Sequence, residues 1–87
     1  MTNDMFLELD YGKLYCVDVH GFTLEQTKAE LHHILSTIDN KYNGILVVHG
    51  YHQGRVLKDY IRGKLTHELI YKKVNIDAAR TILLLSF

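Results

Sequence analysis

The chain alternates short hydrophobic runs with stretches in which hydrophobic residues recur at helical spacing. Runs at 14–19 and 45–48 are rich in β-branched residues, which favour strands, and the second run is uninterrupted, as in a strand buried on both faces. Between the runs, five apolar residues share helical spacing: Leu24, Leu31, Ile34, Leu35 and Ile38. The order of strand, helix and buried strand predicts a βαβ unit.

The helix of this unit has a defined start. Thr23 is suited to be its N-cap, and Gln26, three residues later, completes the pattern of a capping box, which gives partners to two backbone N–H groups. The helical pattern ends near Asn40. A second helix is predicted at 55–69, where leucine and isoleucine recur at every fourth position.

The end of the chain is predicted to form a β-hairpin. Extended runs at 70–76 and 81–85 flank a short connection, Asp-Ala-Ala-Arg, and the second run is apolar enough to be a central strand. A further run at 5–9 predicts an additional N-terminal strand. These elements predict an α/β fold on the border of α+β: a two-layer sandwich with a mixed sheet of about four strands, two helices and the order βαβαββ.

Length and composition indicate one small globular unit. Eighty-seven residues are too few for two cores, so we expect a single domain over 1–87, with an N-terminal arm or edge strand at 1–13 and a core at 14–85. No run is apolar and long enough to cross a membrane, and Cys16 is the only cysteine. We therefore expect a cytoplasmic protein, in which Cys16 fills space in a core strand.

Charge is divided unevenly between the halves of the chain. Residues 1–43 carry three Lys and seven Asp or Glu, whereas residues 44–87 carry seven Lys or Arg and three Asp or Glu. The net charge is zero, so the whole chain favours no particular partner, but a basic surface in the second half would suit a polyanion.

Two His-Gly dipeptides follow the predicted parallel strands. Asp18, His20 and Gly21 end the first strand, and His49 and Gly50 end the second. Ligands of open α/β sheets bind beyond the carboxyl ends of the strands, so the two segments predict one site. Strand alternation points Asp18 and His20 to the same side, and a carboxylate there can fix the imidazole tautomer. The two histidines could then act as base and acid on one phosphodiester.

These motifs resemble those of the Smr (small MutS-related) domain family over about residues 14–85. The stretch at 17–21, Val-Asp-Val-His-Gly, matches the family's Leu-Asp-Leu-His-Gly motif with conservative changes. The stretch at 49–54, His-Gly-Tyr-His-Gln-Gly, resembles its His-Gly-x-Gly-x-Gly motif, except that the middle glycine is His52. The resemblance implies a sandwich similar to the C-terminal domain of translation initiation factor three, with binding to DNA or RNA and, in several members, endonuclease activity.

The resemblance and the residues together give a candidate site. Asp18, His20 and His49 are the candidate catalytic residues. The loop after His49 suits a phosphate, and its tyrosine could stack on an unpaired base, although a tight connection explains the same loop. The basic residues of the second helix could follow a phosphate backbone or form an ordinary solvated face. The candidate nucleic-acid-binding residues are Gly21, Gly50, Tyr51, His52, Gly54, Arg55, Lys58 and Arg62.

Some functional questions stay open in the sequence. The histidines and Cys16 form no zinc-binding spacing, so no structural zinc is expected, whereas a divalent metal ion beside Asp18 stays open. The alternative to a nuclease is a non-catalytic module that binds a ribosome-associated or other protein complex. The sequence does not determine the oligomeric state.

Overall fold

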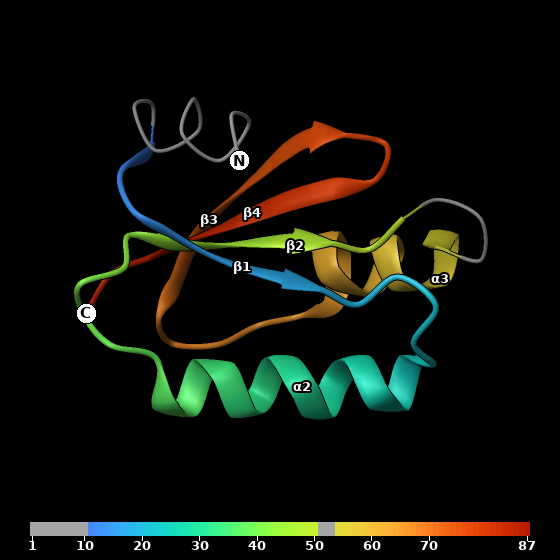
Figure 1. The fold of residues 1–87 in the computed structure, drawn as a ribbon, viewed down its shortest axis with the longest axis horizontal. Helices are drawn as coiled ribbons and strands as arrows, with labels where there is room; N and C mark the ends of the chain where they lie inside the picture. The colour runs from blue at the N-terminus through green and yellow to red at the C-terminus, as the bar shows by residue number, and fades with distance from the viewer. Residues whose placement is uncertain (1–10, 51–53) are drawn as a thin grey trace.

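A four-stranded mixed sheet organises the part of the chain that the computed structural model describes, residues 11–50 and 54–87. Its strands are β1 (Leu14–Asp18), β2 (Gly44–Val48), β3 (Ile70–Asp77) and β4 (Arg80–Leu85), arranged in the order β1-β2-β4-β3 (Figure 1). β1 and β2 are parallel, while β4 is antiparallel to both β2 and β3. The predicted mixed sheet and the central position of β4 are confirmed, and the predicted strand at 5–9 lies outside the described residues.

The connection between the parallel strands is the helix α2 (Leu24–Thr37). The predicted capping box is present: the Gln26 backbone N–H donates to the Thr23 hydroxyl oxygen at 3.1 Å, and the Thr23 N–H donates to the Gln26 side-chain oxygen at 2.9 Å. These bonds satisfy two N–H groups that a helix start leaves without partners. The helix ends before Ile38, slightly earlier than the sequence predicts.

The second helix is shorter than predicted. It consists of α3 (Gly54–Asp59) and a wider turn, η1 (Tyr60–Lys64), so the predicted continuation to Leu69 is wrong. The Leu65 N–H donates to the Tyr60 carbonyl across five residues, and the Lys73 ammonium of β3 donates to the Leu65 carbonyl. This lysine stabilises the carbonyl end of the helix, and the chain then turns to enter β3.

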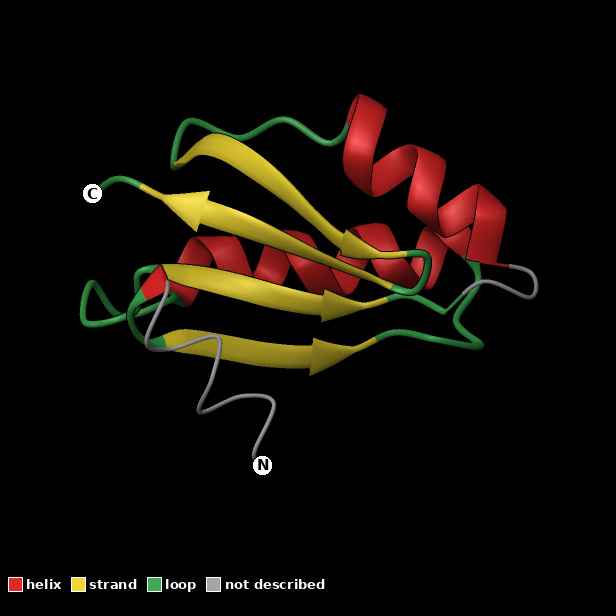
Figure 2. Cartoon of the chain, turned by 90° about the horizontal axis from the view of Figure 1, so that it is seen from above, coloured by secondary structure: helices red, strands yellow, loops and turns green. Residues whose placement is uncertain are grey.

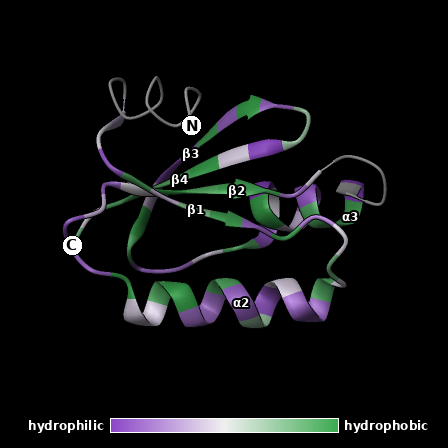
Figure 3. Ribbon diagram, viewed as in Figure 1, coloured by the Kyte–Doolittle hydropathy of each residue, from purple (hydrophilic) through white to green (hydrophobic). Residues whose placement is uncertain are grey.

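Both helical segments cover one face of the sheet, so the fold has two layers (Figure 2). β2 is largely hydrophobic along its length (Figure 3), as a central strand requires. The main core joins residues from β2, β4, α2, α3 and η1 with the residues that directly follow β1 and η1: Val19, Leu31, Ile34, Leu35, Ile45, Val47, Leu57, Ile61, Leu65, Leu83 and Leu85. The fold class predicted from the sequence is confirmed.

The outer face of the sheet, opposite the helices, carries a smaller apolar cluster. It consists of Leu14, Leu46, Ile82 and Leu84. Cys16 lies on this face but is exposed, so the prediction that it fills a core is wrong. The reason is its place on β1, which among the described strands lies at the sheet edge, next to β2 alone. None of the described helices has the length and apolar content of a membrane span.

Candidate functional site

The two His-Gly segments lie side by side, as the sequence predicts. Asp18 is paired with Val48 in the parallel register, and the Val19 N–H donates to the Val48 carbonyl at 2.9 Å one residue beyond the strand. Continued by two residues, this register puts His20 beside Gly50. A Cβ atom built on Gly50 would lie 3.2 Å from the His20 Cβ, so the two backbones approach closely.

Asp18 and His20 form a hydrogen-bonded pair at the solvent-exposed end of β1. The His20 Nδ1–H donates to Asp18 Oδ1 at 2.6 Å, and the His20 backbone N–H donates to the same oxygen at 3.0 Å. The His20 side chain is 69% exposed and the Asp18 side chain is 55% exposed. Because Nδ1 carries the proton of a neutral ring, Nε2 is left as the basic nitrogen, and it has no hydrogen-bond partner among the described residues.

The Asp18 carboxylate is held in its charged form. Partial burial raises its pKa, but the hydrogen bonds from the side chain and backbone of His20, together with the charge of the imidazolium, outweigh this and lower the pKa below the ordinary value. At neutral pH Asp18 is therefore an anion that can stabilise a positive charge on His20.

Two glycines shape the backbone around this pair. The Phe22 N–H donates to the Val19 carbonyl at 3.0 Å, which closes a tight turn with Gly21 at a φ of +83°. Gly50 has a φ of +73° and faces His20. Residues with a Cβ rarely adopt positive φ, and at position 50 a side chain would also press against His20. Both predicted glycines thus position the histidine.

His49 lies on the helix side of the sheet and is only 1% exposed. Its Nδ1–H donates to the Gly50 carbonyl at 2.9 Å, and its Nε2 accepts from the Thr81 hydroxyl at 3.0 Å. The structure therefore brings the two motif backbones together but separates the two imidazoles onto opposite faces. That His49 exchanges a proton with a ligand stays a prediction, and the burial of its ring argues against it.

The environment of His49 favours the neutral ring. Burial lowers its pKa, the nearby charges of Arg62 and Lys58 lower it further, and these effects outweigh the hydrogen bond to the Gly50 carbonyl, which raises it. A neutral ring with Nδ1 protonated matches both hydrogen bonds, because Nε2 is then free to accept from Thr81.

The hairpin between β3 and β4 supports the second motif. The sequence did not predict this support. The Ala79 carbonyl accepts the backbone N–H groups of His49 and Gly50 at 2.9 and 3.0 Å. Thr81, fully buried, links His49 to Arg62, whose Nε donates to the threonine hydroxyl at 2.7 Å. A threonine at the head of an apolar strand was the available signal, because a buried hydroxyl requires a partner.

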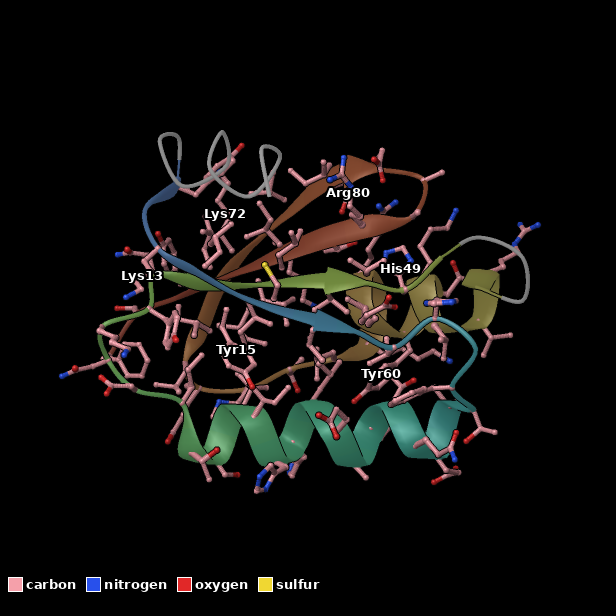
Figure 4. All side chains as sticks on the ribbon, in the orientation of Figure 1. Lys13, Tyr15, His49, Tyr60, Lys72 and Arg80 are labelled. Atoms are coloured by element: carbon pink, nitrogen blue, oxygen red, sulfur yellow. The ribbon has the colours of Figure 1, made fainter. Side chains whose placement is uncertain are left out.

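The predicted basic residues of the second helix differ in how available they are to a ligand. Arg55 is exposed and Lys58 is half-buried, whereas the Arg62 guanidinium is committed to Thr81 and to the carbonyls of Asp77 and Arg80. Arg80, which was not predicted, is paired with Val48 and so lies in the same row of the outer face as Asp18. It forms an ion pair with Asp77 at 2.8 Å. Figure 4 shows Arg80 and His49 toward the same end of the sheet.

The remaining residues of the candidate site belong to the loop after His49, and metal binding was left open by the sequence. Tyr51 and His52 lie outside the described residues, and α3 begins at Gly54. Gly50 is a candidate binding residue, and its N–H is bonded to the Ala79 carbonyl. In residues 11–50 and 54–87, no group of three His, Cys, Asp or Glu side chains could hold a metal ion.

The described residues thus define a two-layer α/β domain with an exposed Asp-His pair at the ends of two parallel strands. The family model of the Smr domain matches residues 17–81, which include both His-Gly segments and most of the sheet. The chain belongs to the Smr domain family. Neither the curated proteins nor the solved structures contain a significant match to the chain.

Proposed function

We propose that this protein binds single-stranded nucleic acid at the carboxyl ends of β1 and β2 and cleaves it with Asp18 and His20. The observation that carries the proposal is the 2.6 Å hydrogen bond from His20 Nδ1 to Asp18 at an exposed strand end. It leaves Nε2 directed away from the carboxylate, as in sites where an acid orients a general base. Membership of the Smr family supports nucleic acid as the ligand class.

In this proposal His20 acts as the general base. The attacking group is a water molecule or the neighbouring 2′-hydroxyl of RNA. The His20 Nε2 accepts a proton from it while the new oxygen–phosphorus bond forms. The bond to the leaving oxygen breaks, and that oxygen takes a proton from solvent. The Asp18 carboxylate stabilises the imidazolium that results, because the hydrogen bond becomes an ion pair.

His49 has a positioning role in the same proposal. Its bonds to the Gly50 carbonyl and to Thr81 fix the backbone that lies against His20. Arg55 and Lys58 supply positive charge on α3 for the phosphate backbone, whereas Arg62 acts within the fold. Arg80 adds a cation to the row that contains Asp18.

A cleavage assay on purified protein tests this function. Fluorescent single-stranded RNA and DNA of equal sequence are incubated with the wild type, Asp18→Asn and His20→Ala, with and without EDTA. We expect each substitution to slow cleavage by about 10²–10⁴-fold, the usual contribution of a general base. His32→Ala, a substitution of an exposed histidine on α2, is the matched control and should cleave at the wild-type rate.

The outcomes separate the alternatives. Equal cleavage by all variants would attribute the activity to a contaminant and reject the proposal. Loss of activity in EDTA, restored by Mg²⁺ or Mn²⁺, would show that a metal ion takes part. Salt-sensitive binding without cleavage would favour the non-catalytic module, which a ribosome-associated or other protein complex could recruit.

A further inference from the structure

A second potential site lies at the other end of β1, away from the His-Gly segments. A pocket of about 500 Å³ is formed by the last turns of α2, the segment 39–42 and the start of β1. Its volume is within the range of about 300 to 1,000 Å³ that is typical of ligand sites. Figure 4 places Lys13 and Tyr15 toward this end of the sheet, and His49 toward the opposite end.

Aromatic rings form one wall of this pocket. Tyr15 of β1 and Tyr42 meet edge to face, with ring centroids 5.4 Å apart. Tyr15 is 39% exposed, although strand alternation directs it to the helix side, where neighbouring residues are buried. An exposed tyrosine in a pocket offers a flat surface for stacking a planar ligand.

The wall is held in place by local hydrogen bonds. The Lys13 N–H donates to the Asn43 side-chain oxygen at 2.8 Å, and the Asn43 N–H donates to the Lys13 carbonyl at 2.7 Å. Asp39 accepts the Lys41 N–H at 2.9 Å, which fixes the turn before Tyr42. The rings are therefore presented on a constrained backbone and require little ordering on binding.

Charged groups of both signs surround the rings. The ammonium groups of Lys13 and Lys41 lie 5.5 and 5.4 Å from the centroid of Tyr42. Glu30 of α2 is half-buried and also lines the pocket. Among the described residues, neither lysine forms an ion pair and Glu30 has no hydrogen-bond partner. The cations suit a phosphate, the aromatic surface suits a base, and the carboxylate suits an amino group on that base.

We infer that this pocket binds one nucleotide whose base carries an exocyclic amino group. The base stacks on Tyr15, its amino group donates to Glu30, and the phosphate binds Lys41, with Lys13 near the same Tyr42 ring. Uracil and thymine present a carbonyl oxygen in place of the cytosine amino group, which the Glu30 carboxylate would repel.

The occupant is a nucleotide within a single strand, an assignment that rests on the proposed function. Asp18 lies three positions after Tyr15 on β1, a distance of about 10 Å at about 3.3 Å per residue. About three stacked nucleotides span it at about 3.4 Å each. Tyr15 faces the helix side and Asp18 the outer face, so a single strand that passes around the edge of β1 could occupy both sites.

Nuclear magnetic resonance titration of the ¹⁵N-labelled protein tests the inference. Cytidine 5′-monophosphate should shift the amide signals of residues 13–15 and 39–43 and bind about five-fold or more tightly than uridine 5′-monophosphate. Tyr15→Ala should weaken this binding about ten-fold or more, and Tyr15→Phe should retain it. Tyr71→Ala, which removes an exposed tyrosine of β3, is the matched control and should change nothing.

Two further arms separate this inference from the proposed function. Asp18→Asn should leave the cytidine monophosphate shifts intact even though it slows cleavage, and Glu30→Ala should remove the preference over uridine monophosphate. A ten-nucleotide oligocytidine should bind more tightly than the mononucleotide, and equal affinity would overturn the single-strand assignment. Shifts confined to residues 18–21 and 49–50, or no saturable shift at residues 13–15 and 39–43, would overturn the pocket.

Discussion

The two His-Gly dipeptides have the same local sequence and opposite environments. His20 is exposed and bonded to a carboxylate, whereas His49 is buried and bonded to Gly50 and Thr81. The in-register pairing of Asp18 with Val48 explains the difference, because His20 comes two residues after that row and His49 only one. Successive side chains of a strand point to opposite faces, so an offset of one residue exchanges solvent for core. A motif therefore gains its chemistry from the face on which it lies.

The strongest test of this comparison is to remove the imidazole of His49 and that of His20 in separate variants. His49→Ala should lower the free energy of unfolding by about 2–4 kcal/mol, because it leaves a cavity and removes the acceptor of the buried Thr81 O–H. His20→Ala should change it by less than about 0.5 kcal/mol, since the ring is at the surface. Urea unfolding followed by circular dichroism measures both, and equal losses would contradict the assignment.

A smaller effect is expected at the glycine between the two rings. Gly50→Ala should destabilise the fold by about 1–2 kcal/mol, because it combines positive φ with a Cβ atom 3.2 Å from that of His20. It should also displace His20 and slow cleavage. Gly63→Ala is the matched control: nothing lies within 4 Å of its added Cβ, and the substitution should be neutral or slightly stabilising. A neutral Gly50→Ala would show that position 50 does not constrain His20.

The buried ring should also make stability depend on pH. The pKa of His49 is lowered from its ordinary value of 6.5, so below pH 6.5 the unfolded chain binds a proton more readily than the folded protein. Stability is therefore highest above pH 6.5 and falls as the pH drops toward the folded pKa. Asp18, whose pKa is also lowered, loses its contribution only at pH values below 3.8, so the two effects are separated.

The urea midpoint of unfolding should fall between pH 7.5 and pH 5.5, and the fall should be smaller in His49→Gln than in the wild type. An unchanged dependence in His49→Gln would assign the effect to another group.

The smallest expected effect concerns the cations of the second helix. Arg55→Ala should leave stability unchanged and reduce the slope of log K against log salt by about one, as the loss of one phosphate contact does. Arg62→Ala should instead destabilise the fold, because its guanidinium holds Thr81 and the hairpin carbonyls. Binding to single-stranded RNA at 50 to 200 mM salt measures the slopes. A reduced slope for Arg62→Ala without a loss of stability would reverse these roles.

Much of the fold could be predicted from local pattern. Helical spacing and the Thr23 capping box defined α2, and uninterrupted apolar runs identified β2 and β4 as central strands. The end of the second helix could not be predicted, because it depends on Lys73, a residue of β3 that donates to the last carbonyls. Cys16 was misassigned for a related reason, since the sequence does not show which strand lies at the sheet edge.

By itself, the sequence determined the elements, their order and the proximity of Asp18 and His20, because these follow from contacts between residues near each other in the chain. Tertiary structure alone decided that His49 is buried, that Thr81 and Arg62 support it, and that Tyr15 and Glu30 share a pocket. Those relations join residues far apart in the sequence. They depend on strand register and sheet order, which no local pattern encodes.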